Sequence, residues 1–400
     1  MNHRERMLAT IDGCPTDRLP WAPRLDLWAL ALNARGTLPD AYRGLDTAGL
    51  ADAMGVACHA VRGDFTIRRD PADLLLRGLG MDNHPDFPYR VELMDLETEF
   101  DTDGENLRTT IHTPDGDVCT HLQMTAAMRR DGISLPFFRS HAIEAVDDLN
   151  AVARIFEHLR VIPAPERYAG FRQRIGDRGL AVAAGPIAAS PVHLMLHELM
   201  PMDRFYYLYA DARAALEDLA GHMEPFFTAL LEAVAHSDAE VVFWGGNYDH
   251  DLTWPPFFQE QIMPWLQRVA DRLHRAGKRV LTHTDGENEG LLPLYPACRF
   301  DVAESVCPQP MTRCSLRQVR KALDPEITVW GGIPSVALLP ESMDDAAFQA
   351  YLDDVFSGLG TGDHLILGVS DNVPPDADLD RLAEIGARAA AFGPVVPPAS

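Results

Sequence analysis

Long apolar runs and closely spaced cysteines are both missing from this sequence. No stretch reaches the ~18 consecutive apolar residues that a membrane-spanning helix needs. The first residues, Met1–Arg6, are charged and polar, unlike the apolar core of a signal peptide. The six cysteines form no Cys-x-x-Cys pair. We therefore expect a soluble, cytoplasmic protein whose thiols stay reduced.

Basic side chains are scarce relative to acidic ones. The chain has 35 lysines and arginines against 59 aspartates and glutamates, for a formal net charge of −24. Such a charge disfavours nucleic acid and anionic lipid surfaces as partners. A Gly-x-Gly-x-x-Gly turn after a first strand is also missing. This motif is typical of a doubly wound, dinucleotide-binding sheet, so its absence disfavours that fold.

Short apolar segments alternate with amphipathic helical patterns from residue 180 onward, and 46% of the residues are hydrophobic. This alternation is typical of βαβ units around a parallel sheet. Strands are expected at 180–186, 240–247, 279–283, 300–304, 327–331 and 364–368, and helices at 213–235, 257–276, 316–323, 344–359 and 379–392. With two further strands at 18–24 and 56–66, the sequence predicts an α/β fold, a TIM-type (β/α)8 barrel, as a single domain over residues 1–400.

Residues 89–124 interrupt this rhythm. Extended, β-rich segments there are separated by the dipeptides Asp103-Gly104 and Asp115-Gly116, and Asp-Gly is a strong hairpin-turn signal. We predict a small antiparallel β-hairpin insertion within the barrel domain, not a separate domain.

Polar side chains follow the ends of the expected strands, where the chemistry of a barrel is located. His283 and Asp285 close one strand and project from the same face, because they are two residues apart. They are candidate metal ligands or an acid–base pair, and a helix cap beside a hydrogen-bonded histidine is the structural alternative. Glu304 lies in the next, otherwise apolar strand, where a carboxylate must be paired, protonated or metal-bound. We expect these three residues to form a functional site.

Further candidates follow neighbouring strands. Cys307, in a proline-rich loop, is either a zinc ligand or a small buried hydrophobic residue. Asp371, followed by Asn372, is a candidate ligand, a general base or a helix cap. Asn247 and Asp249 come after a Gly-Gly pair that lets a ligand approach the backbone, although a turn built by Asn and Asp explains them equally.

Arg24 closes the first expected strand. An arginine there can bind a substrate carboxylate bidentately, and an ordinary salt bridge with the acidic surface is the alternative. The candidate substrate-binding residues are thus Arg24, Asn247, Asp249 and Asn372, and the candidate catalytic residues are Glu304 and Asp371.

Several motifs resemble those of the uroporphyrinogen decarboxylase superfamily over essentially the full chain. They include the opening segments 4–13 and 17–20, Thr113-Pro-Asp-Gly116, the strand and turn at 273–286, Trp330-Gly-Gly-Ile-Pro-Ser335 and Gly368-Val-Ser-Asp-Asn-Val-Pro-Pro375. Within the superfamily the chain resembles the branch of zinc-dependent, corrinoid-linked methyltransferases. The resemblance implies a (β/α)8 barrel, and a homodimer is plausible on the same ground.

The zinc motif departs from that branch at two positions. His283-Thr-Asp285 stands where the branch typically has His-x-Cys, and Ser370-Asp371 stands where a later cysteine is usual. We therefore expect a variant zinc site whose candidate ligands are His283, Asp285 and Cys307.

The function implied by the resemblance is methyl transfer from a small methylated substrate, such as a methoxylated aromatic compound, to a corrinoid on a partner protein or to a thiol. The metal would polarise the leaving heteroatom, and Glu304 or Asp371 would supply or accept the proton. The alternative is a decarboxylase of a uroporphyrinogen-like or smaller carboxylic acid, with Arg24 as anion clamp. Only Arg24 could stand in for the arginine-rich segment of the decarboxylases, which disfavours a porphyrinogen with many carboxylates. A barrel that binds a ligand without turnover is the non-enzymatic alternative.

Overall fold

A parallel sheet forms the centre of the protein, for which a computed structural model describes residues 1–61 and 71–398. Within those residues the sheet has six strands in the order β14-β13-β12-β11-β10-β9. Their bounds are β9 Ala183–Ala184, β10 Val241–Gly246, β11 Arg279–His283, β12 Val302–Val306, β13 Thr328–Ile333 and β14 Leu365–Val369. Strands β10, β12, β13 and β14 are buried along their whole length, which explains why they read as continuous apolar runs.

Backbone pairing continues beyond both edges of this sheet. Strand β1 (Cys58–Ala60) pairs in parallel with β8 (Gly179–Ala181), which leads through Val182 into β9. The predicted strand 18–24 is present in part: Trp21 forms an isolated parallel bridge to Leu367 of β14, and its carbonyl accepts a hydrogen bond from Ala57 N. The prolines on either side of this bridge, at positions 20 and 23, have no N–H to donate to a sheet. Residues 62–66 of the predicted strand 56–66 lie outside the described residues.

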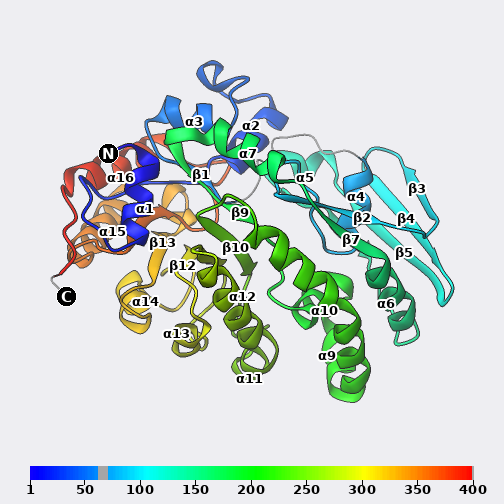
Figure 1. Ribbon diagram of the computed structural model, residues 1–400. Helices are drawn as coiled ribbons and strands as arrows, with labels where there is room; N and C mark the ends of the chain where they lie inside the picture. The colour runs from blue at the N-terminus through cyan, green and yellow to red at the C-terminus, as the bar shows by residue number, and fades with distance from the viewer. Residues whose placement is uncertain (62–70, 399–400) are drawn as a thin grey trace.

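Helices flank the parallel strands, and α10, α12 and α13 lie side by side along one flank (Figure 1). The helices are α1 His3–Ile11, α2 Asp26–Arg35, α3 Thr47–Met54, α4 Pro71–Arg77, α5 Ala126–Arg130, α6 Asp148–His158, α7 Pro165–Ile175, α8 Pro191–Leu194, α9 Met202–Asp211, α10 Arg213–Ala235, α11 Pro255–Phe257, α12 Met263–Arg275, α13 Tyr295–Cys298, α14 Leu316–Ala322, α15 Asp345–Gly358 and α16 Leu379–Ala391. In the described part of the chain, none is long and apolar enough to cross a bilayer.

Side-chain caps explain where several helices begin. Asn2 and Glu5 form a capping box at the start of α1, and Ser315 and Gln318 form one at the start of α14. The helix predicted over 257–276 is interrupted, because residues 258–262 take a π-helical turn between α11 and α12. The helix predicted over 213–235 is confirmed by α10.

A second, antiparallel sheet lies to one side of the molecule, away from both chain ends (Figure 1). Its strands β3 (Thr98–Thr102), β4 (Asn106–Thr113), β5 (Gly116–Gln123) and β6 (Phe137–Ser140) pair in sequence order. The two Asp-Gly dipeptides lie at the β3–β4 and β4–β5 turns, where Gly104 and Gly116 have positive φ. The sheet extends past the predicted limit of residue 124. Next to it, β2 (Tyr89–Leu93) pairs antiparallel with β7 (Leu159–Pro163). That this region is an insertion in a single domain stays a prediction.

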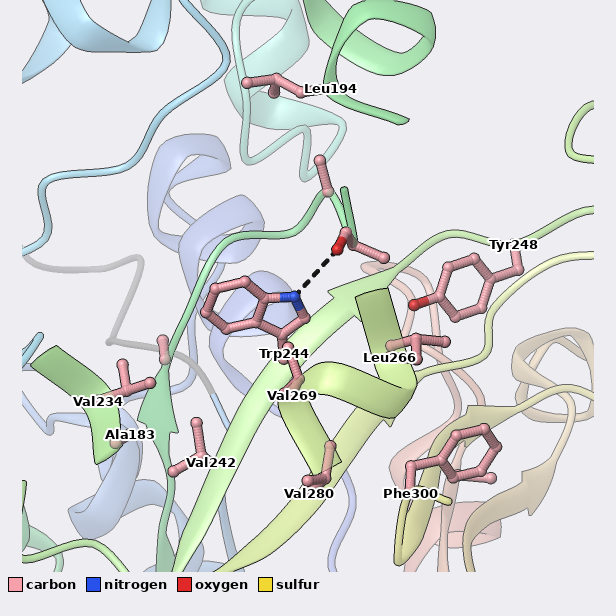
Figure 2. Packing of buried hydrophobic residues seen from close by; sticks show 14 of the residues in the cluster. Ala183, Leu194, Val234, Val242, Trp244, Tyr248, Leu266, Val269, Val280 and Phe300 are labelled. Atoms are coloured by element: carbon pink, nitrogen blue, oxygen red, sulfur yellow. Dashed lines mark hydrogen bonds between the residues drawn. The ribbon is translucent and has the colours of Figure 1, made fainter. Parts of the chain in front are cut away.

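The apolar core fills the space between the parallel sheet and its helices (Figure 2). Trp244 on β10 is fully buried, and its indole N–H donates a hydrogen bond to the carbonyl of Ala189 at 3.1 Å. Val242 and Val280 from the sheet and Leu266 from α12 belong to the same cluster. The core therefore buries a large aromatic side chain while its one polar atom stays hydrogen-bonded.

Candidate active site

Three polar residues from separate strands meet at the C-terminal ends of the parallel strands. His283 is the last residue of β11 and lies opposite Glu304 of β12 in the strand register, and Asp371 follows β14 by two residues. Since parallel strands end at the same edge, these side chains converge there. The predicted grouping of His283 with Glu304 is therefore present in the structure.

Glu304 lies between two histidines. One carboxylate oxygen, Oε2, is 2.6 Å from His283 Nδ1, and the other, Oε1, is 2.9 Å from His59 Nε2. Glu304 is only 3% exposed, so the two imidazoles replace the water that a carboxylate would otherwise need. The ring of Trp330 packs edge-on against His59 with the ring centroids 4.9 Å apart. Glu304 thus holds both rings in fixed orientations.

The protonation of this group follows from its burial and its charges. Burial by itself raises the pKa of Glu304, but the charge and hydrogen bond of His283 and the hydrogen bond of His59 bring that pKa well below its usual range. Burial lowers the pKa of His283, but Glu304, with Asp285 and Asp371, more than offsets this and raises it. A Glu304 carboxylate paired with a His283 imidazolium is the favoured state, so His283 can act as a buried acid.

The other ring nitrogen of His283 faces Asp371. His283 Nε2 lies 4.0 Å from Asp371 Oδ1, and the same oxygen accepts a hydrogen bond from Arg24 at 2.9 Å. The Arg24 guanidinium also donates to Asp26 Oδ1 at 2.9 Å. Arg24, predicted as a substrate clamp, is therefore engaged by two carboxylates of the protein. Asn372 donates its amide N–H to Asp371 Oδ2 at 2.6 Å.

Left-handed backbone marks this edge of the sheet. Asn247, Ser305 and Asp371 have φ of 57°, 61° and 57°. Such conformations cost on the order of 1–3 kcal/mol outside glycine and occur preferentially at functional sites. Ser305 lies where the pairing of β12 with β13 shifts register, a bulge that redirects the neighbouring side chains, and its hydroxyl accepts a hydrogen bond from Asp371 N at 2.7 Å. The bulge therefore joins the end of β12 to the segment after β14.

A cavity of about 270 Å³ opens onto these residues. His59, His283, Asp285, Glu304 and Asp371 line one part of it. Burial raises the pKa of Asp285, and the charge of His283 offsets part of this rise. A cavity of this size suits a small molecule.

Other parts of the cavity wall come from helices and from the strand ends. The wall includes Arg24, Asn247 and a buried ion pair between Arg77 and Glu198 at 2.7 Å. Glu198 belongs to a π-helical turn over residues 195–199. The cavity is thus lined by both charge signs.

The remaining sequence candidates lie elsewhere. Asp249 accepts hydrogen bonds from the backbone N–H groups of Asp251 and Glu287, so it builds a turn. Cys307 lines a separate small hollow that also includes Cys314 and Glu287. Burial raises the pKa of the Cys307 thiol to about 12.

Of the predicted zinc set, His283 and Asp285 line the larger cavity and Cys307 lines the separate hollow. Across residues 1–61 and 71–398, no three His, Cys, Asp or Glu side chains are placed to hold a metal ion. The geometry therefore gives no support to this set, and zinc stays a prediction.

Sequence reasoning missed several residues of the site. His59, Asp26, Arg77 and Glu198 were not singled out, although all four line the cavity. His59 lies in the short strand Cys58-His-Ala60. The only sequence signal for it is that an ionisable residue lies inside a short apolar segment. The 245 positions between His59 and Glu304 leave no local pattern that links them.

Comparison with known proteins gives a likeness in fold. No protein-family model matches the chain, and no curated protein matches it. Among solved structures it is similar to a methyltransferase from Methanosarcina mazei, with a TM-score of 0.55 and 15% sequence identity over 98% of this chain and 99% of that one. At this identity the likeness shows a shared α/β fold.

Proposed function

We propose that this protein is a methyltransferase that removes a methyl group from a small methylated substrate bound beside His283. The observation that carries the proposal is the His283 ring, whose Nδ1 is held by Glu304 while Nε2 faces the side of the site occupied by Asp371. The fold shared with a methyltransferase and the motifs described above support the same reaction class.

The proposed step uses His283 as the acid. The bond between the methyl carbon and the substrate oxygen or nitrogen breaks, and the electron pair stays on that heteroatom. The methyl carbon forms its new bond to the acceptor, while His283 Nε2 gives its proton to the heteroatom. Neutral His283 then regains a proton from solvent. Glu304 stabilises the imidazolium before transfer, and His59 keeps Glu304 in place.

The methyl acceptor in this proposal is a corrinoid carried by a partner protein, or a thiol. We also propose that the chain belongs to the uroporphyrinogen decarboxylase superfamily and that its sheet closes into an eight-stranded (β/α)8 barrel. The pairing of β1 with β8 and the bridge between Trp21 and Leu367 support closure. A homodimer remains a prediction from the resemblance alone.

Decarboxylation of a carboxylic acid is the alternative. It would use Arg24 to hold a substrate carboxylate, but Asp26 and Asp371 both accept hydrogen bonds from this guanidinium. The substrate would have to displace one of them. Methyl transfer needs no such exchange, so the geometry favours it.

The experiment supplies the full chain with methoxylated aromatic compounds and methylamines, each bearing a deuterated methyl group, and with cob(I)alamin as acceptor. We expect labelled methylcobalamin with at least one donor, and its loss in His283→Gln. A matched control is His236→Gln, which changes an exposed histidine at the end of α10. Release of CO2 from a carboxylic acid panel, with no methyl transfer from any donor, would establish the decarboxylase instead.

Zinc assistance is tested separately by elemental analysis of the purified chain and of His283→Ala. One equivalent of zinc that His283→Ala loses would restore the metal-assisted form of the proposal. No zinc in a protein that transfers methyl groups would remove it.

A further inference from the structure

A second hollow of about 420 Å³ lies on another part of the molecule. Residues of α1, the segment 18–21, the end of α3 and helix α16 form its walls, and it shares no described lining residue with the cavity at His283. We call it the α16 groove.

Helix α16 lines this groove with small residues and with Leu379 and Leu382. Ala383, Gly386, Ala387 and Ala390 line it at a spacing that puts them on one face of the helix. The three alanines are exposed. On the opposite wall, Tyr42 and Met54 are partly buried. The groove therefore has an apolar wall whose three alanines are exposed.

One polar atom at this wall lacks a partner. Trp21 is 7% exposed, and its indole Nε1 is buried without a hydrogen bond to any described residue. A carbon placed at the missing Cβ position of Gly386 would lie 3.2 Å from that nitrogen. Trp21 and Gly386 both line the groove, so a ligand there that accepts a hydrogen bond from the indole N–H would satisfy this donor. A buried donor without an acceptor is unfavourable, so such a ligand would relieve it.

Two arginines line the groove, in a protein that carries a formal charge of −24. His3, Arg6 and Arg18 all line it, and burial, together with the charges of Arg6 and Arg18, lowers the pKa of His3. Arg6 is paired with Asp17. Arg18 is exposed and forms no ion pair within the described residues. Its charge remains available for an anion.

We propose that the α16 groove binds a small amphipathic carboxylate. The apolar chain of the ligand lies along the alanines of α16, a carboxylate oxygen accepts the hydrogen bond of Trp21 Nε1, and Arg18 supplies the opposite charge. The apolar wall, the unpartnered donor and the charge of Arg18 each match one part of this ligand. The site is independent of the proposed methyl transfer.

Calorimetric titration of the full chain with octanoate, and with octanol as the uncharged probe of equal length, tests the proposal. We expect octanoate to bind with one site per chain and at least about tenfold more tightly than octanol, because only octanoate uses Arg18. Equal binding of the two probes, or no binding of octanoate, would overturn the proposal.

Two variants locate the site. Ala387→Leu fills the groove from its exposed side, and Arg18→Ala removes the charge; each should weaken octanoate binding by about tenfold or more. Their controls are Ala350→Leu on exposed α15 and Arg275→Ala at the end of α12, which should leave binding within about twofold. Light scattering measures the mass of the same proteins. If octanoate fails to bind and Ala387→Leu changes the mass, the groove is an interface with a second copy and the proposal is wrong.

Discussion

His283 Nδ1 lies 2.6 Å from Glu304 Oε2, in a pair that is almost completely buried. Removal of one member of such a pair leaves the other charge without a partner, which typically costs about 3–5 kcal/mol. We therefore expect Glu304→Ala to lower the free energy of unfolding by about this amount in urea at pH 6.

The matched control for that experiment is Glu232→Ala. Glu232 pairs with Arg272 on the surface, where an ion pair contributes about 0–1 kcal/mol. If the two variants lose equal unfolding free energy, the pair of His283 and Glu304 contributes no more to stability than a surface ion pair.

Stability should depend on pH in a defined window. The raised pKa of His283 contributes stability below the unfolded value of about 6.5, and this is lost as pH rises through the folded pKa. The lowered pKa of Glu304 contributes stability above about 4.3, and this is lost as pH falls. The difference in unfolding free energy between the wild type and His283→Gln should therefore be largest between about pH 4.3 and 6.5. A difference that grows above pH 7 would contradict the assignment.

His59 should act by positioning Glu304. His59→Leu leaves Glu304 Oε1 without its donor, whereas His59→Gln keeps an N–H that can reach it. For methyl transfer we expect kcat to fall by about 10–100-fold in His59→Leu, with a smaller change in KM, and to recover largely in His59→Gln. Equal losses in both variants would indicate that His59 touches the substrate itself.

The left-handed backbone at Asp371 predicts an asymmetry between two substitutions. Asn tolerates φ near 57° better than Ala, for which this conformation costs about 1–2 kcal/mol. Asp371→Ala should therefore be less stable than Asp371→Asn by about 1 kcal/mol in urea unfolding. At Asp353, inside helix α15, the order should reverse, because Ala is the better helix former.

The Cys307 thiol should react slowly. With its pKa raised to about 12 by burial, Cys307 is far less ionised at pH 7.5 than an ordinary thiol, on the order of 10³-fold. Iodoacetamide followed by peptide mass spectrometry should label the exposed Cys14 and Cys119 long before Cys307. EDTA should not change this order. Faster labelling of Cys307 after EDTA would show that a metal had protected it.

Local patterns account for what the sequence predicts correctly. Apolar strands that alternate with amphipathic helices indicate a parallel sheet, because these periodicities reflect burial. The same patterns place His283 and Glu304 near the C-terminal ends of neighbouring strands, because the end of each apolar run marks the end of a strand. The shortening of the predicted strand 18–24 to a single bridge has a local cause as well, in the prolines on either side of Trp21.

Contacts between distant segments could be decided only by the tertiary structure. His59 reaches Glu304 across 245 positions, and Arg24 reaches Asp371 across 347. The bulge at Ser305 interrupts the alternation of β12, so the sequence does not show which way Cys307 faces. The sequence by itself therefore determined which chemistry is available at the strand ends. Packing decided which side chains meet there, because the partners of Glu304 come from segments that are far apart in the sequence.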